Sequence, residues 1–457
     1  MALNVVIMAA GKGTRMKSAR PKVLHRLAGT SLLQHVLAAA AQVGATRTVV
    51  VTGHGAEQVE AEAAGSGAVF VRQLPQLGTG HAVQQAVPAL NPANAVTLIL
   101  NGDVPLIRAE TARALVQACG GTKLALLTIE LPDATGYGRV VRDGASVRAI
   151  VEHKDASPAQ RTIGEVYTGM MAAPTALLTR WVMALRNDNV QKEYYLTDIV
   201  AMAVSEGVPV VASAAASETE VLGVNSPMQL ADLERRHQQS QAQALMESGV
   251  RLADPARLDV RGSLECGSDV EIDVNCIFEG RVQLADGVQV GAHCVIRDAR
   301  IGAGAVIHPY THIEGAVVGA GARVGPYARL RPGTELGEEV HIGNFVEVKN
   351  STLARGAKAN HLAYLGDATV GERVNFGAGS ITANYDGANK HRTVIGNDVH
   401  VGSNCVLVAP VTLGDGATIG GGSTISKPAP AGQLTLARAR QATIAGWQRP
   451  RKATKPG

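Results

Sequence analysis

The stretch from Ile395 to Ile425 decides the fold of the C-terminal half; in groups of six it reads IGNDVH, VGSNCV, LVAPVT, LGDGAT, IGGGST and I. Every group opens with an aliphatic residue, glycine follows that residue in most groups, and Ala, Val, Thr or Ser is frequent four positions on. Such hexapeptide repeats predict an all-β domain folded as a left-handed parallel β-helix. A heptad or α-helical arrangement is excluded, because six is neither seven nor a multiple of 3.6.

The same six-residue step recurs further upstream in the chain. In such a coil the repeating aliphatic side chain points inward and stacks on its counterpart in the neighbouring coil. We therefore predict that the β-helix domain spans residues 249–457. The upstream members of the series are Ile307, Ile313, Val318, Val324, Leu330, Leu336, Ile342 and Val348.

The repeat is interrupted between Ile381 and Ile395. Residues 382–391 are mostly polar and cannot continue a group of six, so we predict a loop that projects from the coil. Polar loops on a rigid scaffold often have a function, although a tolerated insertion is the alternative.

The N-terminal half follows a different pattern. Apolar runs at 5–8, 48–51, 96–100 and 123–127 are each separated by enough chain for a crossover helix. This alternation predicts a doubly wound α/β domain with a mostly parallel sheet over residues 1–227. Residues 228–248 are rich in Gln, Glu, Arg and Ala and contain no glycine or proline, which predicts a linker helix.

Composition narrows the class of protein. With 457 residues, 46% hydrophobic and 18% charged, the chain is globular and long enough for two or three domains. It has neither a membrane-spanning apolar run nor a secretory signal pattern, so we expect a cytoplasmic location. Five scattered cysteines without a CxxC pair argue against disulfides and a zinc site. A net charge of +4 and 3% aromatic residues argue against nucleic-acid binding.

A glycine-rich turn, AAGKGTRM at 9–16, follows the first predicted strand. Glycines at a strand-to-helix turn let backbone N–H groups approach phosphate oxygens, while Lys12, Arg15 and Lys22 can offset phosphate charge. The turn lacks the GxxxxGK[ST] of a P-loop and the third glycine of the dinucleotide fingerprint, so neither an ATPase nor a dehydrogenase is supported. For this element alone, a purely structural turn is the alternative.

A second polar element, Asn101-Gly102-Asp103, directly follows the apolar run that ends at Leu100. A carboxylate at the carboxyl end of a parallel strand lies where ligands bind in open α/β sheets. Mg²⁺ favours one or two carboxylates together with substrate phosphates. We therefore predict that Asp103 is a metal ligand, with a turn-forming aspartate as the alternative.

Polar residues also depart from the six-residue rule in one part of the β-helix. His361 can act as a general base near neutral pH, and Glu347 could orient it or raise its basicity. Arg331, Lys349 and Tyr364 suit a phosphate monoester. Stacked coils bring residues about one turn apart next to each other, so these side chains could converge; a lone histidine on a repeat face is more often a surface residue.

Over nearly its whole length the chain resembles the bacterial bifunctional N-acetylglucosamine-1-phosphate uridyltransferase/glucosamine-1-phosphate N-acetyltransferase family. The resemblance rests on the turn at 9–16, the hexapeptide repeats and six further runs. These are QLPQLGTGHA (73–82), GVN (223–225), GNFVE (343–347), HLAYLGD (361–367), NFGAG (375–379) and NYDG (384–387).

For the N-terminal, Rossmann-like domain the resemblance implies that Asp103 and Asn225 bind Mg²⁺. It also implies that Lys22 lies beside the reacting phosphate of UTP, where Arg15 helps to offset charge. Tyr167 stands where the family has an asparagine before Thr168-Gly169. The nucleotide- and sugar-binding residues implied are Met8, Ala9, Ala10, Gly11, Lys22, Gln73, Gly78, Thr79, Asn101, Gly102, Asp103, Gly138, Glu152, Tyr167 and Asn225.

For the β-helix the resemblance implies that His361 removes a proton as the amine of glucosamine-1-phosphate attacks acetyl-CoA. The residues implied to hold glucosamine-1-phosphate are Arg331, Lys349, Tyr364, Asn375 and Tyr385. Those implied to line the acetyl-CoA site are Ala378, Asn384, Tyr385, Ser403, Gly421 and Arg438.

The resemblance thus implies a soluble, homotrimeric enzyme with small-molecule substrates that makes UDP-N-acetylglucosamine for peptidoglycan and lipopolysaccharide assembly. Acetylation would come first, and uridylyl transfer from UTP would follow. One alternative is a single-activity nucleotidyltransferase whose β-helix only oligomerises or binds a regulator. Another is an acyltransferase with a degenerate N-terminal domain.

Overall fold

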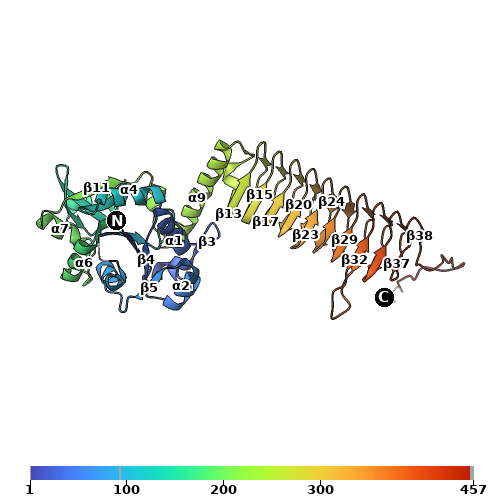
Figure 1. The fold of residues 1–457 in the computed structure, drawn as a ribbon, viewed down its shortest axis with the longest axis horizontal. Helices are drawn as coiled ribbons and strands as arrows, with labels where there is room; N and C mark the ends of the chain where they lie inside the picture. The colour runs from blue at the N-terminus through green and yellow to red at the C-terminus, as the bar shows by residue number, and fades with distance from the viewer. Residues whose placement is uncertain (1, 92–93, 453–457) are drawn as a thin grey trace, which may run out of the picture. The chain divides into compact units, whose positions relative to one another are not determined.

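A computed structural model describes residues 2–91 and 94–452, which form two compact units (Figure 1). One unit ends at Ser240 and the other begins at Gln241. This boundary lies inside helix α9 (Pro227–Glu247), the helix expected over residues 228–248. The first turns of α9 therefore belong to the N-terminal unit, and its last two turns belong to the β-helix unit.

The N-terminal unit is built on a mixed sheet with the strand order β11-β7-β10-β6-β1-β4-β5. The pairs β1–β4, β1–β6, β4–β5 and β11–β7 are parallel, which confirms the predicted α/β class. Strand β10 is antiparallel to both neighbours and also pairs with the β8–β9 hairpin. The strands are β1 (Ala2–Met8), β4 (Arg47–Thr52), β5 (Val69–Arg72), β6 (Ala95–Asn101), β7 (Leu124–Glu130), β8 (Gly138–Asp143), β9 (Ser146–Val151), β10 (Glu165–Pro174) and β11 (Val210–Ala214).

Helices cover both faces of this sheet. Along β1, Val5 and Ile7 pack with α1 and α4, whereas Val6 packs with α3, α6 and α7, because successive strand residues point to opposite faces. The helices are α1 (Leu32–Val43), α3 (Thr79–Ala86), α4 (Ala109–Cys119), α6 (Thr175–Ala184) and α7 (Asp198–Ser205). Shorter elements are β2 (Arg26–Leu27), β3 (Thr30–Ser31), α2 (Ala56–Glu62), α5 (Pro158–Arg161) and α8 (Glu218–Val221).

The C-terminal unit is a parallel β-helix with three faces, in agreement with the predicted left-handed hexapeptide fold. Figure 1 shows its short strands stacked coil upon coil. The first face contains β12 (Arg251–Leu252), β14 (Glu271–Ile272), β16 (Gln289–Val290), β18 (Val306–Ile307), β21 (Arg323–Val324), β24 (His341–Asn344), β27 (Lys358–His361), β30 (Asn375–Phe376), β33 (His400–Val401), β36 (Thr418–Ile419) and β38 (Leu434–Thr435).

The other two faces share three long strands at the N-terminal end, β13 (Leu258–Cys266), β15 (Cys276–Leu284) and β17 (Val295–Ile301). The second face continues through β19 (His312–Glu314), β22 (Arg329–Leu330), β25 (Glu347–Lys349), β28 (Tyr364–Gly366), β31 (Ile381–Ala383), β34 (Val406–Val408) and β37 (Thr424–Ile425). The third face continues through β20 (Ala316–Val318), β23 (Thr334–Leu336), β26 (Thr352–Leu353), β29 (Ala368–Val370), β32 (Thr393–Ile395) and β35 (Val411–Leu413).

The aliphatic series of the hexapeptide repeats fills the interior of this coil. From Ile307 to Ile425 its predicted members are all buried and form one continuous apolar cluster. Phe278, also in this cluster, fills the interior near the first coils. Each coil therefore buries its apolar residues only against its immediate neighbours, as expected of a solenoid.

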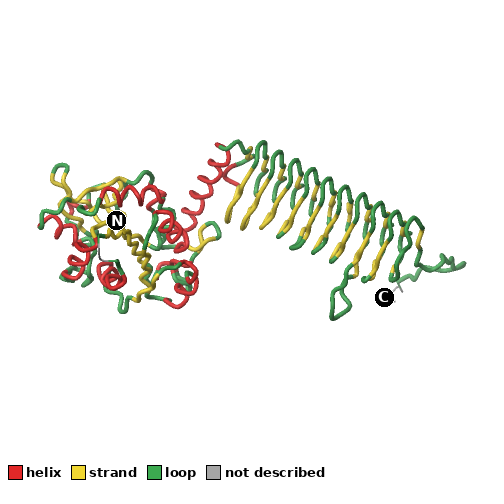
Figure 2. Tube along the Cα trace, viewed as in Figure 1, coloured by secondary structure: helices red, strands yellow, loops and turns green. Residues whose placement is uncertain are grey.

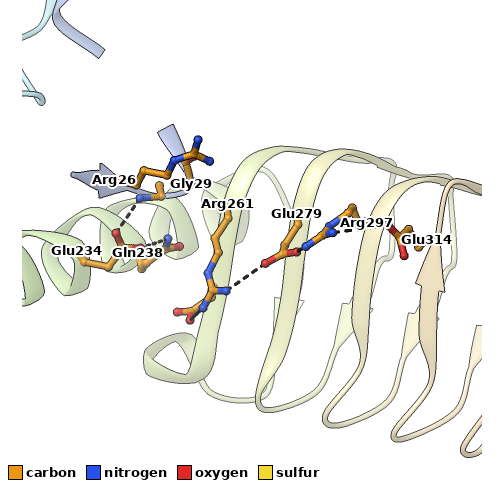
Figure 3. Close-up of polar contacts among 10 residues, drawn as sticks. Arg26, Gly29, Glu234, Gln238, Arg261, Glu279, Arg297 and Glu314 are labelled. Carbon is orange, nitrogen blue, oxygen red and sulfur yellow. Dashed lines mark hydrogen bonds and ion pairs between the residues drawn. The ribbon is translucent and has the colours of Figure 1, made fainter. Parts of the chain in front are cut away.

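A ladder of alternating charges runs along the second face (Figure 3). Glu279 accepts a hydrogen bond from Arg261 of the preceding strand at 3.1 Å and from Arg297 of the following strand at 2.8 Å. Arg297 also pairs with Glu314 at 3.6 Å. The Arg297 and Arg261 guanidinium groups hold the pKa of Glu279 below its usual range. Because Arg261, Arg297 and Glu314 are partly exposed to solvent, each of these pairs contributes little to stability.

The predicted interruption at residues 382–391 is a hairpin that projects from the coil between β31 and β32, visible in Figure 2. A β-bridge joins Tyr385 and Lys390, and the His391 backbone N–H donates to the Asn384 carbonyl at 2.8 Å. No helix within residues 2–91 or 94–452 is long and apolar enough to cross a bilayer.

Candidate active sites

The glycine-rich turn and Asp103 meet at one edge of the N-terminal sheet. Strands β1 and β6 are parallel neighbours with Met8 opposite Asn101, so the residues that follow both strands emerge side by side. The Gly102 backbone N–H donates to the Met8 carbonyl at 2.9 Å. A Cβ at Gly102 would lie 3.1 Å from the Met8 oxygen and 3.3 Å from the Ala9 Cβ, so this close approach favours glycine.

A cavity of about 270 Å³ opens at this edge. Gln73, which is buried, donates through Nε2 to the Gly78 carbonyl at 2.9 Å, so its amide is held in one orientation. Gln76 and Glu193, which the sequence did not single out, also line the cavity. The predicted nucleotide-binding residues that line it are Met8, Ala9, Ala10, Gly11, Lys22, Gln73, Gly78, Thr79, Asn101 and Asp103.

A second cavity of about 200 Å³ adjoins the first. Met8, Thr79 and Asn101 line both cavities, so a ligand could extend from one into the other. Gly138, Glu152 and Tyr167, the predicted sugar-binding residues, line the second cavity only.

Glu152 and Tyr167, which both line this second cavity, have raised pKa values. Burial raises the pKa of Glu152, and the nearby carboxylates of Asp198, Asp155 and Glu193 raise it further, although Thr197 donates to Glu152 at 3.0 Å. Burial also raises the pKa of Tyr167 well above its usual value, with Glu152 adding to the effect. The Tyr167 hydroxyl has no hydrogen-bond partner among the described residues. An unpaired buried hydroxyl is costly, so a ligand hydroxyl at this point would satisfy it.

The two predicted metal ligands converge on a single cation. The Lys22 ammonium binds the Asp103 carboxylate and also the Asn225 Oδ1 at 3.1 Å. The Val224 backbone N–H donates to the Asp103 carbonyl at 2.9 Å and keeps the two segments together. A carboxylate and an amide oxygen that share a cation form a donor set suited to Mg²⁺. Arg15, by contrast, is exposed in a short 3₁₀ turn and does not line either cavity.

In the β-helix, His361 ends strand β27 at the corner between the first and second faces. Its register partner on β24 is Asn344, and the two side chains bond through His361 Nδ1 and Asn344 Oδ1 at 2.9 Å. An amide oxygen accepts here, so Nδ1 carries the proton and Nε2 is left free to accept one. Tyr364 begins strand β28 three residues after His361.

Glu347 does not make the contact that we expected from the sequence. Its carboxylate binds Arg331 at 2.9 Å and lies 3.5 Å from Arg329, so it holds these guanidinium groups rather than His361. The structure assigns the orienting contact to Asn344 instead. The reason is the strand register, which places Asn344 and not Glu347 opposite His361.

Positive charge accumulates where the Arg–Glu ladder of the second face stops alternating. Continuing the register beyond Glu314 leads to Arg331 and then to Lys349, two cations in succession. Lys390, at the base of the projecting hairpin, lies beside Lys349, and its ammonium lowers the pKa of Lys349. Lys349 and Lys390 are thus two neighbouring cations, whereas the charge of Arg331 is paired with Glu347.

Of the predicted acetyl-CoA residues, Ala378, Ser403 and Gly421 extend from His361 along one corner of the coil. Backbone hydrogen bonds link this column: Gly379 N–H to the His361 carbonyl, Asn404 N–H to that of Ala378, and Gly422 N–H to that of Ser403. Arg438 donates to the Gly421 carbonyl at 2.8 Å, so the C-terminal segment reaches the end of the column. Asn384 and Tyr385 lie instead at the base of the projecting hairpin, beyond the other end of the second face.

Asn375, a predicted glucosamine-1-phosphate ligand, does not lie beside His361 within one chain. It begins strand β30 on the first face, in register with Lys358 and His400, and donates to His400 at 3.2 Å. His361 is at the opposite end of β27 from Lys358, so a single chain does not bring Asn375 to the histidine.

Sequence reasoning missed Asn344, Lys390 and His400. For Asn344 a signal was present, since it precedes His361 by 17 residues, about one coil. Lys390 could not be placed from the sequence, because the path of a hairpin that leaves the repeat is not periodic.

Comparisons with known proteins agree with both halves of the structure. Residues 5–254 match the MobA-like NTP transferase domain family, residues 260–344 match the GMPPB C-terminal domain family, and residues 392–427 match the bacterial transferase hexapeptide family with six repeats. The bifunctional protein GlmU of Methylibium petroleiphilum is 77% identical and covers 98% of this chain and 99% of its own.

The chain belongs to the GlmU family. A GlmU protein of Paracidovorax citrulli is 68% identical, with 99% of each chain covered, and one of Cupriavidus pinatubonensis is 60% identical, covering 99% of this chain and 100% of its own. The predicted family and the predicted fold of both halves are thereby confirmed. Like other GlmU proteins, this chain is a bifunctional transferase with a nucleotidyltransferase half and a hexapeptide acyltransferase half.

Proposed function

We propose that the chain first acetylates glucosamine-1-phosphate with acetyl-CoA on its β-helix. It then transfers the uridylyl group of UTP to the N-acetylglucosamine-1-phosphate so formed, in the N-terminal unit, and releases pyrophosphate. The observation that carries the proposal is that one chain contains two candidate sites. One is a pair of adjoining cavities at a glycine-rich sheet edge, and the other is the second face of the β-helix, with the His361 imidazole at one end and the Lys349 and Lys390 cations at the other. The membership of the GlmU family supports the same pair of activities.

In the acetyl transfer, the sugar amine attacks the thioester carbon, its proton passes to Nε2 of His361, and the CoA thiolate leaves. The Nδ1 contact to Asn344 keeps the accepting nitrogen free. Arg331 and Lys349, with Tyr364 and Tyr385, would bind the sugar phosphate. Ala378, Ser403, Gly421 and Arg438 would contact acetyl-CoA along the corner that begins at His361, and Asn384 and Tyr385 would contact it from the base of the hairpin.

In the uridylyl transfer, a phosphate oxygen of the sugar substrate attacks the α-phosphorus of UTP and pyrophosphate leaves, without a protein nucleophile. The first cavity would hold the nucleotide, with uracil near Gln73, and the second would hold the sugar near Glu152. Mg²⁺ would be held by Asp103 and Asn225, and when bound it neutralises charge on the phosphates. Lys22 would offset charge at the reacting phosphate, and Arg15 would do so from the rim.

We further propose that the functional domains span residues 1–227 and 249–457 with a linker helix over 228–248. The β-helix would form a homotrimer, in which Asn375 of one copy is available to the glucosamine-1-phosphate site of another. Its displacement from His361 within one chain supports this arrangement.

Both reactions are tested by supplying acetyl-CoA, glucosamine-1-phosphate, UTP and Mg²⁺ and identifying the product by mass, with each reagent omitted in turn. His361→Ala should abolish CoA release while keeping pyrophosphate release from UTP and N-acetylglucosamine-1-phosphate. Asp103→Ala should abolish pyrophosphate release while keeping CoA release. If CoA release survives in His361→Ala, the β-helix is an oligomerisation or regulatory module, as the single-activity alternative holds.

A further inference from the structure

Asp367 is a buried carboxylate at the corner between the second and third faces of the β-helix. Only 7% of its surface is exposed, and its backbone has a φ of 50°, in the left-handed region. One carboxylate oxygen accepts from the Asn350 amide, and the other accepts from the Asn384 amide. Asn350 comes from the preceding coil and Asn384 from the following one, so Asp367 joins three successive coils.

The bond to Asn384 fixes the base of the projecting hairpin. Within the hairpin, the Asp386 carboxylate accepts the backbone N–H groups of Ala388 and Asn389 at 2.8 and 2.6 Å. These bonds and His391 lower the pKa of Asp386. Hydrogen bonds within the hairpin therefore stabilise its conformation, and the bridge between Tyr385 and Lys390 places both residues next to its base. The Asn384 side chain, buried against Asp367, ties that base to the coil.

Asp367 also provides negative charge that interacts with two mutually repelling cations. Burial by itself raises the pKa of Asp367, but the two amides and the ammonium groups of Lys349 and Lys390 lower it on balance. Lys349 and Lys390 come from different elements, the end of β25 and the hairpin, yet lie side by side. The Asp367 carboxylate offsets part of the repulsion between these two cations.

We propose that Asp367 is a positioning residue for acetyl transfer: it holds Asn384 and the hairpin in place and keeps Lys349 and Lys390 together for the phosphate of the amino sugar. The inference rests on the proposed function, because it assigns Asp367 to the same site. Asp367 touches neither substrate in this arrangement. Its effect is on how well the site is formed before substrates bind, and therefore on KM for both glucosamine-1-phosphate and acetyl-CoA.

The test begins with Asp367→Asn in the full-length enzyme, which keeps the size of the side chain and tolerates the left-handed backbone. The amide can accept from one asparagine only and meets the other with its own NH₂ group. Losing one hydrogen bond to a buried charge should raise each KM about tenfold or more. The kcat at saturation should change less, because the His361–Asn344 contact is untouched.

A paired exchange separates positioning from simple damage. In Asp367→Asn combined with Asn350→Asp, the new amide donates to the carboxylate at 350 and accepts from Asn384. Both hydrogen bonds and the net charge are restored, so both KM values should return to within about threefold of the wild type. Asn350→Asp alone places two carboxylates together and should be impaired. Asp298→Asn is the matched control, since Asp298 also has a left-handed backbone but, within residues 2–91 and 94–452, its side chain accepts a hydrogen bond from the Arg281 backbone N–H alone. This variant should leave both KM values unchanged.

Cooperative thermal unfolding of the β-helix, followed by circular dichroism on every variant, checks that this unit is folded, and pyrophosphate release checks the N-terminal unit. The inference is overturned if folded Asp367→Asn has wild-type KM values, or if the paired exchange does not rescue them. Absence of acetyl transfer in the wild type would instead refute the proposed function, so the two failures are distinguishable.

Discussion

A carboxylate in place of the Asn344 amide provides a sharp test of the acetyl-transfer site. His361 is exposed, and its Nδ1 lies 2.9 Å from the Asn344 oxygen. Two opposite unit charges at this distance attract by about 1.4 kcal/mol when the dielectric constant is that of water. Asn344→Asp should therefore favour the protonated imidazole about tenfold. Because the proposed acetyl transfer needs the neutral His361 ring, the acidic limb of the pH profile of kcat/KM should move to higher pH by about one unit.

The assay is CoA release from acetyl-CoA and glucosamine-1-phosphate, followed from pH 5 to 9 at low salt. High salt should reduce the displacement, because the pair is exposed to solvent. Asn344→Ala removes the acceptor without adding charge, so it should lower kcat by about tenfold and not displace the acidic limb to higher pH.

Asn275→Asp is the matched control for added charge. Asn275 contacts His293 at 3.3 Å in an earlier coil, so the substitution creates a similar Asp–His pair away from the site. Its pH profile should equal that of the wild type. An unshifted acidic limb in Asn344→Asp, or a shift to lower pH, would refute the assignment of His361 as the base held by Asn344.

Three further predictions follow from contacts in the two units. Lys22→Met should tighten Mn²⁺ binding without nucleotide about tenfold, measured by electron paramagnetic resonance, because the ammonium that shares Asp103 and Asn225 is gone. The same variant should lose uridylyl transfer about a hundredfold, whereas Lys17→Met should leave Mn²⁺ affinity unchanged. Glu152→Gln should raise the Tm at pH 8, because burial raises the pKa of Glu152 and ionisation above that pKa destabilises the folded unit. The gain in Tm should shrink as the pH falls through the pKa of Glu152. A gain in Tm that does not depend on pH would contradict this explanation. Ile342→Ala, which removes a fully buried side chain of the coil, should reduce the stability of the β-helix by about 2–5 kcal/mol in chemical denaturation. Uridylyl transfer should persist at denaturant concentrations that unfold the β-helix of this variant.

The sequence predicted the β-helix well because its contacts are close to periodic. Each coil packs on the next one, so Ile342 and its counterparts recur at a step that can be counted along the chain. In the N-terminal unit, the runs at β1, β4, β6 and β7 were recognisable by their apolar character. Strand β10 was not, because its antiparallel insertion between β6 and β7 depends on partners far away in the chain.

The same distinction applies to the residues of the candidate sites. Gly102 and Asp103 could be placed from the sequence, because they directly follow a strand whose end lies at a known edge of the sheet. The partner of His361 was missed, although Asn344 precedes the histidine by about one coil, because the exact length of each coil decides whether Asn344 or Glu347 lies opposite it.

By itself, the sequence determined the two folds, the glycine-rich turn, Asp103 and the histidine of the β-helix, because each depends on residues adjacent in the chain or separated by a regular repeat. The tertiary structure alone decided that Lys22 shares Asp103 with Asn225, that Lys390 joins Lys349, and that Asp367 ties three coils together. Such contacts depend on strand register and on the path of a non-periodic hairpin, and a register that differs by one residue turns a side chain to the opposite face.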